Sequence, residues 1–126
     1  MRNTLLSASL ILSGWAVLAP PALGFEIEVQ TLFEAANASD TIDIISTADT
    51  DRFAPLIIAF QDRNPDLAIN YVTVSSAELM NALQEEGASF DLAISSAMDL
   101  QTKLSNDGLT LSHTSDATEL VPDWAK

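Results

Sequence analysis

From Thr41 onward, the apolar residues of the chain follow two alternating periods, one typical of strands and one typical of helices. Short apolar runs predict three strands, at "TIDIIS", "LAINYVTV" and "FDLAIS". A segment with helical spacing follows each run, namely "DRFAPLIIAFQDRN", "SAELMNALQEEG" and "SAMDLQTKLSNDG". The order βαβαβα with short links predicts an α/β fold, a three-layer parallel sheet with right-handed crossovers.

The same spacing predicts which positions are buried and where the helices end. The first helix places Phe53, Leu56, Ile57 and Phe60 on one face. Asn64-Pro65 ends that helix, and Gly87 and Gly108 end the second and third. The second strand alternates most clearly, so we expect it at a half-exposed edge of the sheet.

The first 24 residues have the pattern of a secretory signal peptide. Arg2 precedes the apolar run "LLSASLILSGWAVLA", and the small residues Ala22 and Gly24 suit a signal peptidase. We expect cleavage after Gly24 and a periplasmic mature chain. The run is shorter and more interrupted than the about 20 apolar residues of a spanning helix, so we expect no stable membrane insertion. An uncleaved anchor is the alternative.

Residues 25–40, "FEIEVQTLFEAANASD", have a weaker pattern. Partial helical spacing is followed by a run of small and polar residues that is typical of a linker. We therefore expect a leader that packs loosely on one domain formed by residues 41–126.

Charge and composition exclude several classes of partner. The chain has 5 basic and 18 acidic residues; without residues 1–24, which hold one arginine and no acid, 4 against 18 leaves −14. Nucleic acids and anionic membranes favour clustered Lys and Arg, so we expect neither as a partner. Cysteine is absent from the sequence, which excludes disulfides and a lipoprotein attachment site.

Hydroxyl side chains follow each predicted strand. The three pairs are Ser46-Thr47, Ser75-Ser76 and Ser95-Ser96. In a parallel sheet these exits share the carboxyl edge, where ligands bind at the point of strand-order reversal and helix N-termini favour oxyanions. Helix capping is the other interpretation, because Ser75-x-x-Glu78 fits a capping box and Ser96-x-x-Asp99 fits a looser one. Both interpretations stay open at this point.

Other candidate chemistry is weaker, and we expect no enzyme, no metal and no cofactor. Asp49, Asp51 and Lys103 resemble part of a phospho-receiver site, but the third strand ends in serine where such a site needs aspartate. His113 is the single histidine, whereas a metal site needs several convergent ligands. Joining it to Ser95 or Ser96 as a catalytic pair lacks a nucleophile-elbow pattern. Tyr71 and Trp124 are expected to be packing residues.

The segments "PLIIAFQDRNPDLAINY" and "FDLAISSAMDLQTKLSNDG" resemble the opening of a periplasmic solute-binding protein of an ABC transporter. The group it resembles includes iron(III)-type and phosphoglycerate-type receptors, and the resemblance spans residues 41–126. It implies the first lobe of a type II periplasmic binding protein, with a small-molecule solute and a membrane permease as partners. The residues that it implicates in ligand binding are Ser46, Thr47, Ser95 and Ser96, with Ser75 and Ser76 as less certain contributors.

Members of that family have two lobes, whereas this sequence ends at "ELVPDWAK", near where the first lobe would lead into the second. The resemblance therefore implies a truncated receptor. Its expected function is to bind a small polar or anionic solute, or an iron complex, at the carboxyl edge of the sheet for an importer. The alternative is an exported single-lobe interaction module that docks a partner protein without transport.

Overall fold

Four strands form one sheet in the order β1-β3-β2-β4. The computed structural model describes residues 24–125, so the predicted signal peptide, apart from Gly24, lies outside the described residues. The strands are β1 (Val29–Phe33), β2 (Asp40–Ser46), β3 (Leu67–Thr73) and β4 (Leu92–Ile94). The helices are α1 (Thr50–Gln61), α2 (Ser76–Met80) with a π-helical turn η1 (Asn81–Glu85), α3 (Met98–Asn106), and two 3-10 turns, η2 (Asp116–Leu120) and η3 (Asp123–Ala125).

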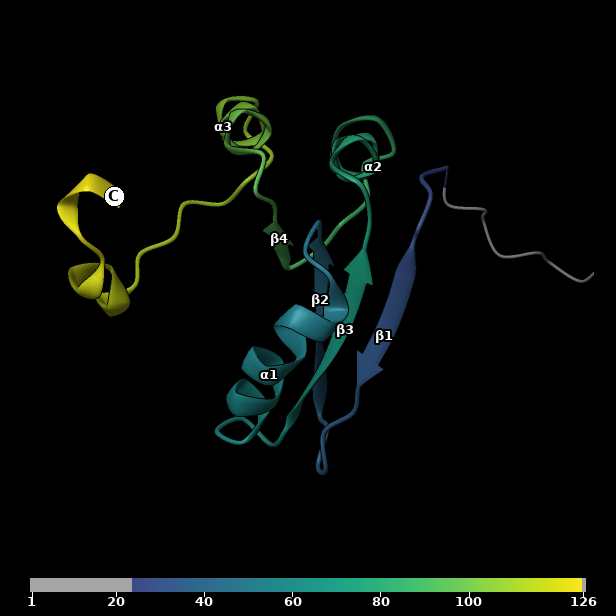
Figure 1. Cartoon of the computed structure of the whole chain (residues 1–126), viewed down its shortest axis with the longest axis vertical. Coiled ribbons are helices and arrows are strands. Elements are labelled where there is room, and N and C mark those ends of the chain that lie inside the picture. The colour runs from purple at the N-terminus through teal and green to yellow at the C-terminus, as the bar shows by residue number, and fades with distance from the viewer. Residues whose placement is uncertain (1–23, 126) are drawn as a thin grey trace, which may run out of the picture.

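The three strands predicted from the sequence pair in parallel. β2 lies between β3 and β4, with Asp40 opposite Leu67 and Ile44 opposite Leu92. The chain therefore passes from β2 to β3 on one side and returns past β2 to reach β4 on the other (Figure 1). The predicted α/β fold is confirmed.

The first described strand corrects two expectations. Residues 25–40 are not a loose leader, because β1 pairs with β3 in antiparallel register and Phe25 is buried in the core. As a consequence β3 is an internal strand and not the predicted edge strand. The sequence pattern missed β1 because Val29 and Leu32 are half exposed, so no apolar face marks this edge strand.

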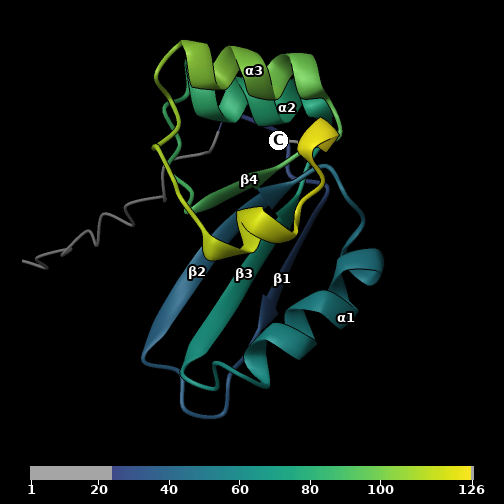
Figure 2. The ribbon, with the colours of Figure 1, turned by 90° about the vertical axis from the view of Figure 1, so that its left-hand side faces the viewer.

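Helices cover both faces of the sheet, which confirms the three layers. α1 lies on one face, where Ile57 packs with Ile44, Ile69 and Tyr71. α2 and α3 lie side by side on the other, near the carboxyl ends of the strands (Figures 1 and 2). The core of this second face is larger; its buried members are Phe25, Ile45, Val72, Val74, Leu79, Ala82 and Leu104.

The face that carries α1 is only partly covered. A groove of about 300 Å³ runs between α1 and strands β2 and β4. Only apolar residues line it: Ile42, Ile44, Phe53, Leu56, Ile57, Phe60, Ile69, Leu92 and Ile94. We call this feature the α1 groove. The predicted apolar face of the first helix thus exists, but Leu56 and Phe60 remain exposed on it.

Local stop signals act where the sequence predicted them. α1 ends at Gln61, just before Asn64-Pro65. Gly87 and Gly108 have φ of 62° and 75° after the second and third helices, a conformation that glycine adopts without steric cost. Between residues 24 and 125, no helix is long and apolar enough to cross a membrane.

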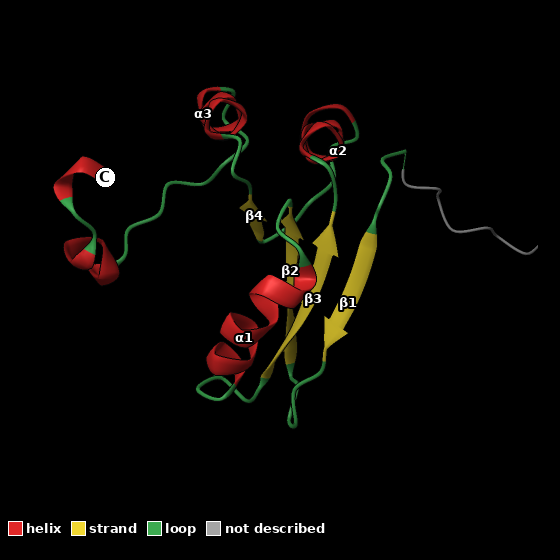
Figure 3. Ribbon diagram, viewed as in Figure 1, coloured by secondary structure: helices red, strands yellow, loops and turns green. Residues whose placement is uncertain are grey.

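The chain after α3 forms an exposed arm, residues 109–125. It consists of loop and the two short turns η2 and η3, and it reaches away from the sheet (Figure 3). Every residue from 109 to 124 is exposed, including Leu111, Leu120 and Trp124. Among the described residues, Trp124 therefore does not have the packing role that was expected of it.

Candidate functional site

The carboxyl ends of β2 and β4 meet at the point where the strand order reverses. The amide of Thr47 donates to the carbonyl oxygen of Ile94 at 3.0 Å, and Thr47 Oγ1 donates to Ser95 Oγ at 3.4 Å. Both side chains are half buried. In open α/β sheets this reversal is where ligands bind. The structure thus brings together two of the hydroxyl residues that the sequence singled out.

Helix starts flank this contact. Ser95 Oγ accepts a hydrogen bond from the amide of Ala97 at 3.1 Å, one residue before α3 begins. Ser96 is exposed, and the looser capping box with Asp99 does not form. Within the described chain, no side chain caps the first turn of α1 or of α3. The first-turn amides of these helices are therefore a source of partial positive charge at this edge.

Ser46 is a buried structural residue and not an exposed ligand-binding residue. Its side chain is fully buried, and Ser46 Oγ accepts from the amide of Ala48 at 3.0 Å and from the Tyr71 hydroxyl at 2.8 Å. These bonds shape the turn that leads from β2 to α1. Ser46 has no free surface for a solute, so we leave it out of the proposed site.

Tyr71 is the buried partner of that turn. Its hydroxyl also lies 3.0 Å from the carbonyl oxygen of Ala48, and its ring stacks on Phe53 with centroids 5.7 Å apart. Burial raises the pKa of Tyr71 above its ordinary value, and the charge of Asp49 raises the pKa further, while the hydrogen bond with Ser46 lowers it. The phenol is thus a neutral packing residue, as the sequence predicted.

Ser75 caps α2, as its sequence pattern indicated. Ser75 Oγ accepts from the amide of Glu78 at 3.2 Å. The reciprocal half of the capping box is absent at this helix, because Glu78 Oε2 accepts from the amide of Glu26 at 2.9 Å. Glu78 thereby ties the segment before β1 to α2. Ser75 is exposed and Ser76 half buried at the end of β3, on the far side of β2 from Ser95.

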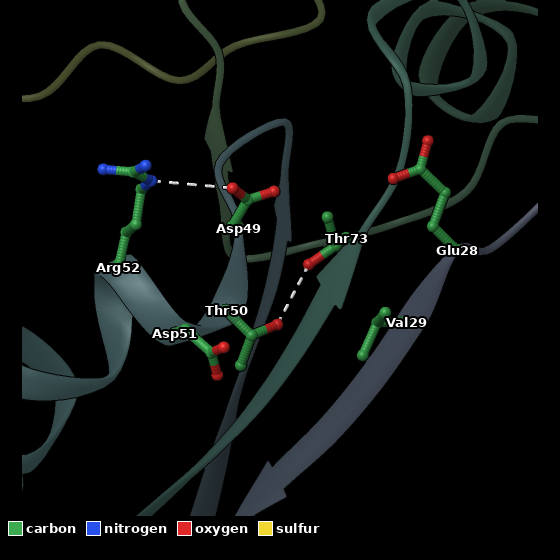
Figure 4. Close-up of a pocket in the computed structure, with 7 residues that line it drawn as sticks. All are labelled: Glu28, Val29, Asp49, Thr50, Asp51, Arg52 and Thr73. Atoms are coloured by element: carbon green, nitrogen blue, oxygen red, sulfur yellow. Dashed lines mark hydrogen bonds and ion pairs between the residues drawn. The ribbon is translucent and has the colours of Figure 1, made fainter.

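A polar pocket of about 510 Å³ lies at the same edge, beside the start of α1 (Figure 4). Thr50 Oγ1 and Thr73 Oγ1 lie 3.1 Å apart in it, joining α1 to the end of β3. Arg52 Nε lies 3.6 Å from Asp49 Oδ2. The complete lining is Glu28, Val29, Asp49, Thr50, Asp51, Arg52 and Thr73.

Sequence reasoning missed this pocket as a solute site. It considered Asp49 and Asp51 only as parts of a receiver domain, and it placed Glu28 in the leader of residues 25–40. The pocket exists because β1 pairs with β3 and brings Glu28 and Val29 beside Thr73. A pairing between residues so distant in sequence leaves no local signal.

The charges of the pocket favour hydroxyl or cationic groups over free anions. Three carboxylates, of Glu28, Asp49 and Asp51, face one guanidinium, and Arg52 is already paired with Asp49. Like charges repel an incoming anion, although salt weakens this at exposed positions. Across the described ranges, no group of three or more His, Cys, Asp and Glu residues is arranged to hold a metal. His113 lies in the exposed arm.

Comparison with known proteins identifies similarity to a solved structure. No family model matches the chain, and no curated protein matches it. The substrate binding protein of the ABC transporter from Agrobacterium tumefaciens is similar in structure, with a TM-score of 0.72 and 32% sequence identity. The match covers 81% of this chain and 32% of the Agrobacterium protein, so this chain spans about a third of the length of that protein. The predicted resemblance to solute-binding proteins of ABC transporters is confirmed, while the iron(III) or phosphoglycerate subgroup stays a prediction.

Proposed function

We propose that the chain binds a small polar solute at the carboxyl edge of its sheet, as the substrate-binding component of an ABC-type importer. The structural similarity to the Agrobacterium protein supports this class of function. In this proposal the chain performs no catalysis, works in the periplasm and delivers solute to a membrane permease. The candidate ligand residues are Thr47, Ser95 and Ser96, with Ser75 and Ser76 at the neighbouring strand exit.

One observation carries the proposal: the contact between Thr47 and Ser95 at the reversal of strand order. The contact is long for a hydroxyl pair, at 3.4 Å, so a solute oxygen can replace it at little cost. The uncapped first turns of α1 and α3 begin on either side and supply amide donors. A set of hydroxyl and amide donors of this kind suits a solute with several hydroxyl or carbonyl oxygens.

Two opposing electrostatic effects decide which class of solute we expect. Helix N-termini favour an anion at the Thr47–Ser95 contact, whereas Glu28, Asp49 and Asp51 oppose an anion in the adjacent pocket. A neutral polyhydroxyl solute satisfies both regions, so we rank it first. An anionic solute or an iron complex is the second choice, with its charge beside Ser95 and away from Asp51.

Affinity on this open edge should be low. Hydroxyl contacts exposed to water contribute about 0.5–1.5 kcal/mol each. Association costs an estimated 4–15 kcal/mol, which a handful of such contacts scarcely offsets. We expect millimolar dissociation constants for the chain on its own.

Calorimetric titration with sugars, phosphate esters, organic acids and iron(III) chelates tests the proposal. Thr47→Val and Ser95→Ala should each weaken binding, since a hydrogen bond to a solute contributes up to about 3 kcal/mol when the solute is charged. Ser39→Ala is the matched control, because Ser39 directly precedes β2, at the opposite end of the strand from Thr47. Equal affinity in wild type and both edge variants would remove this edge as the binding site.

A second candidate function, docking of a partner protein, is favoured by the α1 groove. An apolar carboxyl edge would have favoured that function, but the pocket at this edge is polar. The apolar surface lies instead on the face that carries α1. Solute binding and docking therefore concern two different surfaces, and one does not exclude the other.

A further inference from the structure

The segment that follows the expected cleavage point after Gly24 is built into the fold from its first residue. The side chain of Phe25 is 4% exposed and belongs to the larger core. Its ring meets the ring of Phe90 edge-on, with centroids 6.5 Å apart. The amide of Glu26 donates to Glu78 Oε2 at 2.9 Å, which holds the segment beside α2 (Figure 1). An apolar side chain and a backbone hydrogen bond therefore anchor the two residues directly after Gly24.

Gly24 itself lies against the carboxylate of Glu86, an exposed residue that directly follows η1. A Cβ atom added to Gly24 would overlap this carboxylate, since both of its oxygens would lie within 2.7 Å of the added atom. The nitrogen of Phe25 is bonded to the carbonyl carbon of Gly24, so standard bond lengths place it within about 6 Å of the same carboxylate. Cleavage after Gly24 would turn this nitrogen into an ammonium group beside an anion.

We propose that the chain is cut between Gly24 and Phe25 and that the ammonium group of the new N-terminus pairs with Glu86 while the Phe25 ring stays in the core. Hydrolysis by a signal peptidase of the exporting cell breaks the peptide bond, consumes one water, and leaves a carboxylate on Gly24 and an amine on Phe25. The amine takes up a proton at neutral pH. The proposal makes no use of solute binding, so it does not depend on the proposed function.

Two independent observations meet at this one bond. The small residues Ala22 and Gly24 suit a signal peptidase that cuts after Gly24. The folded chain, for its part, places a carboxylate within the range at which an opposite charge favours the charged form of a group. The nearby carboxylates of Glu26 and Glu78 add to the same effect, although Glu78 already accepts the amide of Glu26. Residues on both sides of the bond thus fit cleavage and the retention of its product.

The cut has to precede folding. A peptidase binds the residues on both sides of the bond that it hydrolyses, and proteolysis of a folded chain needs backbone that is exposed or locally unfolded. In the folded chain Phe25 is buried and the amide of Glu26 is already bonded. A chain that meets the peptidase unfolded avoids this obstacle, and folding then encloses Phe25.

Expression of the full chain, residues 1–126, in a Gram-negative host tests the position of the cut. Intact mass and N-terminal sequencing of the periplasmic protein should give a chain that begins at Phe25. Gly24→Tyr should leave the leader attached, because the residue before the bond has to be small. Leu23→Tyr is the matched control, since the middle position of the small-residue pattern accepts other residues. A mature chain that begins at another residue, or full-length wild type in the inner membrane, would overturn the proposal.

Acetic anhydride labelling of the periplasmic protein at pH 7 tests the ion pair, because this reagent reacts with uncharged amines. A free peptide of sequence "FEIEV" supplies the same N-terminus without the fold. We expect the amine of the protein to react about two- to fivefold more slowly, as is typical of an exposed ion pair.

The effect of Glu86 is separated from general shielding by two variants. Glu86→Gln should remove most of the difference in labelling rate. Glu85→Gln is the matched control, because it deletes the same charge at the neighbouring exposed position and should leave the rate close to that of wild type. Equal rates in wild type and Glu86→Gln, or equal changes in the two variants, would contradict the pairing.

Discussion

The two faces of the sheet differ in how completely helices cover them. On the face of α2 and α3, seven buried apolar residues form one core cluster, which includes Leu79 and Ala82. On the face of α1, four buried residues form a smaller core beside the open α1 groove. Adjacent residues of one strand serve the two faces, since Ile44 belongs to the smaller core and Ile45 to the larger.

The difference separates stability from interaction. The covered face removes most of the apolar surface from water and should supply most of the folding free energy. The open face keeps large side chains such as Leu56 and Phe60 exposed, so these side chains contribute little to the folding free energy of the chain on its own. A substitution should therefore have different effects on the two faces even when the residue type is the same.

The largest effect is expected for a leucine on the covered face. Leu79→Ala should lower the free energy of unfolding by about 2–5 kcal/mol, because the side chain is fully buried and its loss leaves a cavity. Leu56→Ala, on the open face, should stay within about 0.5 kcal/mol. Urea denaturation of both variants measures the contrast, and equal losses would show that the two faces are covered alike in solution.

Tyr71→Phe should have the next largest effect. The substitution keeps the ring that stacks on Phe53 but removes the hydroxyl between Ser46 Oγ and the carbonyl of Ala48. Leaving buried polar groups without a partner costs about 1–3 kcal/mol. Chemical denaturation measures the loss. An unchanged free energy of unfolding would mean that water takes the place of the hydroxyl. Water would then reach Ser46 and Ala48 from the face of α1, which the structure shows as closed there.

A smaller loss is expected for Ser75→Ala on the covered face. Ser75 Oγ caps the short helix α2, and removing such a cap typically costs about 1 kcal/mol. Ser76→Ala is the control, since Ser76 follows the cap. Thermal unfolding followed by circular dichroism distinguishes the two variants, and equal midpoints would argue that contacts of Leu79 alone hold α2 in place.

The smallest effect within the accessible pH range concerns Tyr71 ionisation. Its folded-state pKa is raised above 10.0, so the folded state holds the phenolic proton more tightly than the unfolded chain does. The stability from this group is complete below pH 10 and is lost as the pH rises through the folded-state pKa. Wild type should therefore lose stability more steeply above pH 10 than Tyr71→Phe in urea titrations at several pH values. Parallel slopes would contradict the raised pKa.

The sequence by itself determined the features that depend on local pattern. Three parallel strands, three helices, the glycines that end two of them and the Ser75 cap all follow from residues within a few positions of one another. The carboxyl-edge meeting of Thr47 and Ser95 also followed, because parallel strands of one sheet place their exits on the same edge.

Only the tertiary structure decided the features that depend on long-range pairing. β1 joined the sheet through backbone hydrogen bonds to β3, which any side-chain pattern permits, and so the internal position of β3 and the pocket at Glu28 and Thr73 could not be predicted. Burial of Ser46 likewise depended on Tyr71, 25 positions along the chain, closing over it. The apolar face of α1 was predictable from its spacing. Whether that face is covered depends on which other elements pack against it, and the spacing of residues within one helix does not determine this.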